Sequence, residues 1–190
     1  MRPFLSKVDS RIVKKARRGD KGAHAKLYQL CAPMIYTLAR RMLVSTAMAE
    51  DVLQETFIEV IRKIHTYRGD AGFEFWVRRI AVNKCLMSLR SAWNSKRVDI
   101  ELTDSILPIT DGEQVDKQLI LESALDRLSA TARTVVWLHD VEGYTHKEIG
   151  EMMRKTTSFS KSQLARAHER LRGFLDDNSI EDNKNYANQN

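Results

Sequence analysis

The sequence predicts an all-α protein built of two small helical domains joined by an acidic, flexible linker. The chain of 190 residues holds only 8 Gly and 3 Pro, so few positions interrupt a helix. Apolar residues recur at spacings of three and four through most of it, and no clear alternating pattern typical of a strand appears. The helical pattern lapses between about 97 and 114, where Pro108, Asp111 and Gly112 punctuate the linker.

The first domain is expected to begin with two helices. The first covers about 9–18 and ends at Gly19-Asp20. The second covers about 21–43, and Pro33 is expected either to kink it or to split it in two. Its apolar positions are Ala25, Leu27, Tyr28, Leu30, Cys31, Met34, Ile35, Leu38, Ala39 and Met42.

Two more helices complete the first domain, at about 47–65 and 73–94, with a glycine-containing loop at 67–72 between them. The helix at 47–65 is amphipathic, with an apolar stripe on one side and a charged stripe on the other. The apolar stripe is Leu53, Phe57, Val60, Ile61 and Ile64, and the opposite one is Asp51, Glu55, Glu59 and Arg62.

The second domain is expected to hold helices at about 115–128, 130–141, 145–153 and 158–175. The tail 176–190 is rich in Asn and Asp and has almost nothing to bury, so disorder is expected there. The predicted segments are therefore a domain at 1–95, a linker at 96–114, a domain at 115–175 and a tail at 176–190.

Composition and charge narrow the function. No apolar run is long enough to span a bilayer and the N-terminus lacks the apolar core of a signal peptide, so we expect a cytoplasmic protein. Cys31 and Cys85 belong to no Cys-x-x-Cys pair and are expected to be buried free thiols. Residues 1–98 carry a net charge of +12, residues 99–126 carry −7, and residues 127–190 carry +1. A basic block followed by an acidic one favours a polyanionic partner, most simply nucleic acid.

The segment 73–90 carries the most specific chemistry. Phe73, Phe75 and Trp76 run directly into a series of cations with no acid after Glu74. Aromatic faces stack on unpaired bases, and cations hold phosphates, so this helix is a candidate for gripping opened nucleic acid. The alternative is core packing, because the apolar residues of the segment also recur at helical spacing.

Residues 145–171 have the pattern of a helix-turn-helix. Thr145 and Glu148 form a capping-box pair, and the polar turn 154–157 precedes a second helix that buries Leu164, Ala167 and Leu171. Small and basic residues lie roughly opposite that buried stripe, which is the geometry that enters a DNA major groove.

Taken in order, these features resemble the extracytoplasmic-function (ECF) sigma factors, the two-domain specificity subunits of bacterial RNA polymerase. The resemblance covers about residues 10–175. Its motifs are Gly19-Asp20, Ala23 and Leu27-Tyr28 at the start of region 2; the polymerase-binding helix Ala49 to Phe57; Phe75-Trp76, Ile80-Ala81, Asn83 and Leu89-Arg90 of the −10 helix; and Ser158 to Leu171 of the region 4 recognition helix.

The resemblance implies a fold of two parts, the region 2 helical bundle and the region 4 helix-turn-helix, and a set of contacts for each. Core polymerase, through the coiled coil of its largest subunit and its flap region, and promoter DNA are the implied partners; an anti-sigma factor is common in the family. No cofactor, metal ion or catalytic residue is implied. The implied core-binding residues are Glu50, Asp51, Gln54 and Glu55. The implied −10 contacts are Tyr67, Arg68, Phe73, Trp76, Arg78, Arg79, Asn83, Lys84 and Arg90, with one flipped base held by the loop at Tyr67–Phe73. The implied −35 contacts are Ser158, Phe159, Lys161, Ser162, Gln163, Ala165, Arg166 and Arg170.

The chain departs from the family pattern in the helix-turn-helix. Arg154 stands where the family usually has a turn glycine. Phe159 and Ser160 replace a common Thr-Val, which puts a hydroxyl at an inward position.

The acidic linker is implied to pass through the polymerase's active-site cleft and RNA exit channel, where negative charge lets a peptide occupy a channel built for RNA.

Three other functions are compatible with parts of the sequence. A helix-turn-helix regulator that binds duplex DNA without polymerase leaves the acidic helix and the aromatic loop unexplained. An enzyme is disfavoured because the chain has no phosphate loop, no Gly-x-Ser-x-Gly motif and no metal-spaced His/Cys cluster; Gly143 and Tyr144 interrupt the neighbourhood of His139, Glu142 and His146. A helical adaptor that binds RNA through its basic surface predicts no promoter-dependent transcription.

Overall fold

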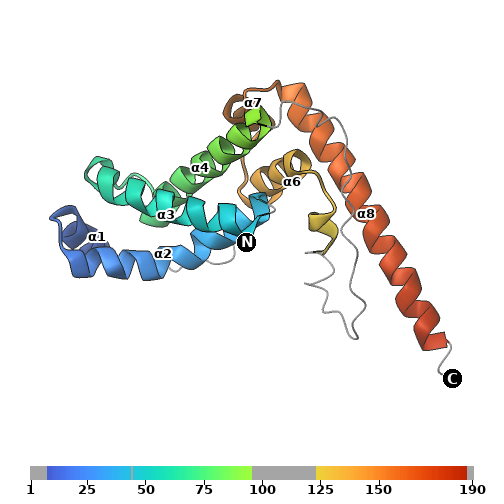
Figure 1. The fold of residues 1–190 in the computed structure, drawn as a ribbon, viewed down its shortest axis with the longest axis horizontal. Helices are drawn as coiled ribbons and strands as arrows, with labels where there is room; N and C mark the ends of the chain where they lie inside the picture. The colour runs from blue at the N-terminus through green and yellow to red at the C-terminus, as the bar shows by residue number, and fades with distance from the viewer. Residues whose placement is uncertain (1–7, 44, 96–122, 188–190) are drawn as a thin grey trace. The chain divides into compact units, whose positions relative to one another are not determined.

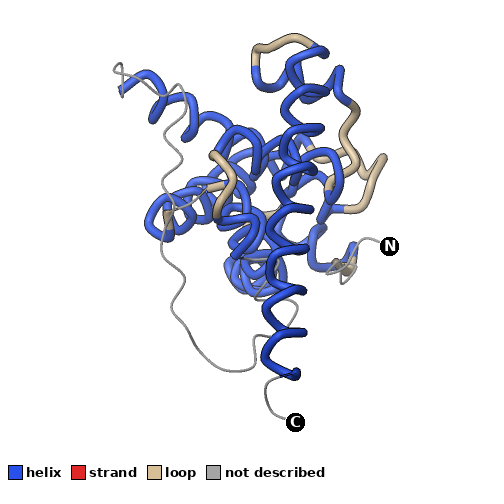
Figure 2. Tube along the Cα trace, turned by 90° about the vertical axis from the view of Figure 1, so that its right-hand side faces the viewer, coloured by secondary structure: helices blue, strands red, loops and turns tan. Residues whose placement is uncertain are grey.

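The computed structural model describes residues 8–43, 45–95 and 123–187, and for 92–95 and 175–187 it describes the backbone alone. Every regular element in these residues is helical, as Figure 2 shows, so the predicted all-α class is confirmed for the described part of the chain. The chain divides into two compact units, Met1–Val98 and Asp99–Asn190.

The first unit contains five elements, shown from blue to green in Figure 1. They are α1 (Ser10–Arg17), α2 (Lys21–Met42), α3 (Thr46–Lys63), the short 3₁₀ helix η1 (Ile64–Thr66) and α4 (Phe73–Ser95). Side chains cap the first three helices: Asp9 accepts from the backbone N–H of Arg11, Asp20 from that of Ala23, and Ser45 from that of Met48. These caps satisfy N–H groups that have no partner within the helix, and each typically stabilises it by about 1 kcal/mol.

Helix α2 is continuous across Pro33, so the expected split into two helices does not occur. Proline in a helix interior removes one backbone hydrogen bond and strains the preceding turn. Packing explains why the helix continues, because Cys31, Met34, Ile35 and Leu38 are all buried around this point while Pro33 itself is exposed. Burial of a side chain of this size contributes about 1.5–3 kcal/mol, which together outweighs the cost of one proline.

The core of the first unit lies where α2, α3 and α4 pack on one another. Its fully buried side chains include Leu27, Ile35, Met42, Val60 and Val77. The predicted apolar stripe is correct for Phe57 and Val60 on α3 and for Ile64 at the start of η1, which are buried. It is wrong for Ile61, which is 42% exposed. Ile61 lies at the edge of the stripe, and the inner side of the helix turns instead through Val52 and Thr56, which are buried.

The second unit contains α6 (Ala130–Val136), the π-helical turn η2 (Trp137–Val141), α7 (His146–Met153) and α8 (Thr157–Ala187), and residues 123–126 are also helical. Its core is formed by Val135, Leu138, Ile149, Leu164 and Ala167. The predicted capping box at the start of α7 is confirmed, with Thr145 and Glu148 exchanging side-chain and backbone hydrogen bonds. Most of the predicted helix 115–128 and the linker 96–114 lie outside the described residues.

Helix α8 differs from the sequence-based expectation at its C-terminal end. It continues to Ala187, through most of the segment 176–190 that we expected to be disordered; residues 188–190 lie outside the described ones. The expectation counted only the apolar area that the tail can bury. Extension of an existing helix, however, gains one hydrogen bond per residue and avoids the unfavourable nucleation step.

Candidate nucleic-acid interface

Helix α4 has a buried side and an exposed side. Its buried side is formed by Phe73, Glu74, Val77, Ala81, Val82, Cys85, Leu86 and Leu89. On the other side, Arg79, Asn83 and Met87 are exposed, and Trp76 and Arg90 are half-buried. Arg78 and Lys84 are also half-buried, but the helical period places both among the buried positions, and Lys84 reaches across to Glu55 on α3. The core-packing interpretation is therefore confirmed for the buried side of α4. The nucleic-acid interpretation stays a prediction for the exposed side.

Three aromatic rings form a cluster where the loop 67–72 meets α4. The ring centroids of Tyr67 and Phe73 lie 5.3 Å apart, those of Tyr67 and Trp76 lie 5.6 Å apart, and those of Phe73 and Trp76 lie 5.5 Å apart. Phe73 is only 3% exposed. Its ring therefore supports the other two from beneath, and Tyr67 and Trp76 are the rings with surface to offer a base.

The loop itself is held by a few specific contacts. The Tyr67 hydroxyl donates to the Ala71 carbonyl, which closes the loop across four residues. Gly69 adopts a φ of +89°, a conformation that residues other than glycine rarely adopt. Desolvation, followed by the charges of Glu74 and Asp70, raises the pKa of Tyr67, so its hydroxyl stays protonated and remains a donor. Arg68 is exposed within this loop.

The predicted core-binding residues Glu50, Asp51, Gln54 and Glu55 are all exposed on α3. They form a single face because they are spaced at three and four residues. Two apolar side chains that sequence analysis did not assign to this face continue it, Ile58 with 66% exposure and Ile61 with 42%. The sequence signal for Ile58 was present, because it follows Gln54 by four residues on the charged side of the helix.

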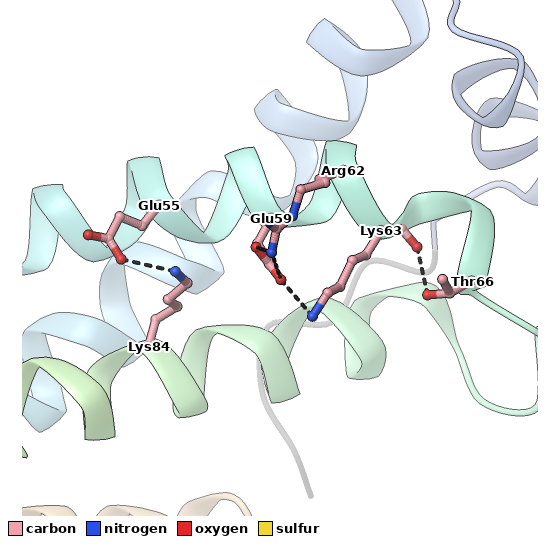
Figure 3. A network of polar contacts seen from close by, with 6 residues as sticks. All are labelled: Glu55, Glu59, Arg62, Lys63, Thr66 and Lys84. Atoms are coloured by element: carbon pink, nitrogen blue, oxygen red, sulfur yellow. Dashed lines mark hydrogen bonds and ion pairs between the residues drawn. The ribbon is translucent and has the colours of Figure 1, made fainter.

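An ion pair joins the two predicted interfaces of the first unit. The Lys84 ammonium, predicted to contact DNA, lies 3.1 Å from a carboxylate oxygen of Glu55, predicted to contact polymerase (Figure 3). Further along α3, the Glu59 carboxylate accepts from Lys63 and Arg62, each at 2.6 Å, and these two cations lower the pKa of Glu59 to about 2. Glu59 is thus engaged within α3, whereas Glu55 is shared between α3 and α4.

In the second unit, α7, a tight turn and α8 form the predicted helix-turn-helix. Arg154 occupies the turn with φ 56° and ψ 40°, the left-handed conformation that explains the family's glycine there. The close approach in this turn falls at Gly150, where an added Cβ would lie 2.9 Å from the Lys155 carbonyl oxygen. Gly150 therefore occupies the position with the closest backbone contact, and Arg154 adopts the strained left-handed conformation at the turn.

The predicted −35 contacts lie mainly on the exposed side of α8. Ser158, Lys161, Ser162, Ala165, Arg166 and Arg170 are exposed, while Phe159 and Gln163 are half-buried. Ser160, which stands where the family commonly has an apolar residue, is fully buried. Its hydroxyl is satisfied by His146 at the start of α7, whose Nδ1 lies 3.1 Å away. A buried hydroxyl in place of an apolar side chain is tolerated only with such a partner.

His146 also belongs to a polar cluster that joins η2, α7 and α8. Its ring stacks on that of His139 with centroids 4.5 Å apart, and Asp140 pairs with His139 at 2.9 Å and with His168 at 2.6 Å. Desolvation, together with His139 and Lys161, lowers the pKa of His146. No group of three metal-ligating side chains converges among the described residues.

Comparison with known proteins identifies the chain. Residues 27–95 match the family model of sigma-70 region 2, and residues 118–171 match that of sigma-70 region 4. The ECF RNA polymerase sigma factor SigM of Mycobacterium tuberculosis H37Rv is 30% identical over 83% of this chain and 79% of its own length. The chain belongs to the ECF sigma factors. The sigma factor CarQ of Myxococcus xanthus is also 30% identical, over 87% of this chain and 96% of its own length.

A solved structure has the same fold as this ECF sigma factor. The sigma factor RpoE of Bartonella quintana, in complex with the anti-sigma factor NepR, aligns with a TM-score of 0.54 at 20% identity. The alignment covers 80% of this chain and 96% of the RpoE chain.

Family membership decides between the functions left open by the sequence. As an ECF sigma factor, the chain binds core RNA polymerase and directs promoter-specific initiation of transcription. It is a regulatory subunit and not an enzyme, and a helix-turn-helix regulator that acts without polymerase is not favoured. Among the described residues, no helix is long and apolar enough to cross a membrane.

Proposed function

We propose that the exposed face of α3 is the surface that docks on core polymerase. Glu50, Asp51, Gln54 and Glu55 supply acids and an amide to basic side chains on the coiled coil of the polymerase's largest subunit. Ile58 extends this face with an apolar side chain of 66% exposure, so docking combines charge attraction with apolar burial. The observation that carries the proposal is that all four predicted residues are exposed on one face, although the helix buries its other side.

The −10 element is proposed to bind across the loop 67–72 and the exposed side of α4. One base leaves the stack and lies against Tyr67 and Trp76, whose contacts offset the few kcal/mol that extrusion costs. Asn83 is the proposed base-edge contact because it is exposed and its amide both donates and accepts. The proposed backbone contacts are Arg68, Arg78, Arg79, Lys84 and Arg90.

The −35 element is proposed to meet the N-terminal half of α8 in the major groove. Ser158, Ser162 and Ala165 are small enough for close approach, and Lys161, Arg166 and Arg170 are cations that reach phosphates or base edges. Residues 1–95 then serve as region 2 and residues 115–175 as region 4, which also contacts the polymerase flap. The acidic segment 96–114 is proposed to pass through the polymerase between them, in the cytoplasm.

An anti-sigma factor is a proposed further partner. Two solved structures with a similar fold are complexes of this kind, RpoE of Bartonella quintana with the anti-sigma factor NepR and CnrH with the cytosolic domain of CnrY.

The docking proposal is tested by charge reversal on α3. Asp51→Lys is expected to weaken binding to core polymerase strongly, and Asp51→Lys with Glu55→Lys is expected to abolish it, because like charges at an interface cost several kcal/mol. Asp70→Lys is the matched control, since Asp70 is also an exposed aspartate of the same unit and lies in the loop 67–72. Pull-down with core polymerase and circular dichroism measure binding and fold; unchanged core affinity in the folded double variant overturns the docking surface.

A further inference from the structure

Helix α1 presents a face made entirely of cations. Arg11, Lys14, Lys15 and Arg18 follow one another at spacings of three, four and seven residues from Arg11, and all four are exposed. This spacing places Arg11, Lys14 and Lys15 on one side of the helix, and Arg18 follows as its C-cap residue. The opposite side is buried through Val13 and Ala16. We call these four residues the α1 basic face.

The acids near this face are engaged elsewhere. Residues 9–21 contain six Lys and Arg and two acids. Asp9 caps α1 and pairs with Arg11 at 2.9 Å, and Asp20 caps α2 through the Ala23 N–H at 2.6 Å. Within the described part of the chain, no acid pairs with Lys14, Lys15 or Arg18. The helix dipole favours a cation in the last turn of α1, but it does not account for cations along the whole face.

The location of α1 connects this face to the −10 site. The Arg17 guanidinium donates to the His65 carbonyl at 3.2 Å, which ties α1 to η1. Helix η1 ends at Thr66, and the loop 67–72 with its aromatic cluster follows immediately. In Figure 1, α1 lies at the end of its unit where α3 turns back toward α4.

We propose that the α1 basic face holds the phosphates of the single DNA strand that runs on from the base held in the loop 67–72. The inference rests on the proposed −10 function and adds to it a second, sequence-independent contact surface. Single strands follow basic surfaces next to aromatic rings on which a base stacks, and this combination is present here. From Arg11 to Arg18 the face extends for about 10 Å along the helix axis, enough to follow the strand beyond the loop.

The first experiment uses the full chain without polymerase and a fluorescent single-stranded DNA of random sequence. Fluorescence anisotropy at several salt concentrations gives the affinity and its salt dependence. Lys14→Gln is expected to weaken binding and reduce the slope of log affinity against log salt by about 0.7, the value for one phosphate on a single strand. Lys26→Gln is the matched control, because Lys26 is an exposed lysine of α2 that is not part of the α1 basic face, and it is expected to leave the slope unchanged. Equal slopes in the two folded variants overturn the inference.

The second experiment uses holoenzyme and two fork templates built from a promoter recovered by in vitro transcription. In one, the single strand ends directly after the −10 element, and in the other it continues downstream. Lys14→Gln with Lys15→Gln is expected to weaken binding to the long fork and to leave the short fork unchanged. Equal loss on both forks overturns the placement. Failure to form holoenzyme instead contradicts the proposed function, and the first experiment still decides whether the α1 basic face binds the strand.

Discussion

Neutralising Glu55 is predicted to strengthen DNA binding by the first unit. Glu55→Gln removes the partner that holds the Lys84 ammonium at 3.1 Å and leaves that cation available for a phosphate. At this distance the Coulomb attraction in water is about 1.3 kcal/mol. The Glu55 side chain is 60% exposed and that of Lys84 is 21% exposed, so salt and side-chain entropy reduce the net value to about 0.2–1 kcal/mol. The expected gain in affinity is therefore about 1.4- to 5-fold.

The assay is a double-mutant cycle of Glu55→Gln and Lys84→Gln, read by anisotropy on single-stranded DNA. Asp51→Asn is the matched control, because it removes one negative charge from the same helix face a turn away. We expect Glu55→Gln to exceed the control in the wild-type background and to match it when Lys84 is already Gln. A gain from Glu55→Gln that is the same in both backgrounds would refute the ion pair as the cause.

Four further predictions concern the second unit. Arg154→Gly is expected to raise the free energy of unfolding by about 1 kcal/mol in chemical denaturation, because glycine adopts a φ of 56° without strain; a loss of stability would contradict this. Asp126→Ala is expected to destabilise the unit by about 2 kcal/mol, because the Asp126 carboxylate lies 2.8 Å from the Arg133 guanidinium and that side chain is only 3% exposed. An unchanged melting temperature would count against this prediction. Because the pKa of His146 is lowered in the folded protein, the unfolded chain binds protons more readily, and stability is expected to fall as the pH drops below about 6.5. His146→Gln is expected to reduce this loss of stability, measured by melting curves at pH 7.5 and 5.5. An identical pH dependence in the variant would exclude His146 as its source. Arg166→Ala is expected to weaken −35 binding and lower its salt slope by about 0.9 if the contact is to a phosphate, and an unaltered footprint would argue against that contact.

Much of the fold was predictable because local signals decided it. Asp9, Asp20 and Ser45 cap the helices that they precede, and the capping box at Thr145 marks the start of α7. These are short-range effects, since the side chain and the N–H group that it satisfies lie two or three residues apart.

Contacts between helices were not predictable from the same signals. The pairing of Lys84 with Glu55 and that of Ser160 with His146 join residues 29 and 14 positions apart, and no sequence period reports which side chains meet across two packed helices. The burial of Phe73 beneath Tyr67 has the same cause, because an aromatic residue at a helix start suits either a core or a base-binding surface.

Transcription in vitro with purified core RNA polymerase on a genomic fragment library tests the central claim most directly. The chain is predicted to bind core polymerase and to produce transcripts that start at defined positions, and Asp51→Lys with Glu55→Lys is predicted to abolish them. Duplex DNA binding by the chain alone, with no association with core and no chain-dependent transcripts, would contradict the account.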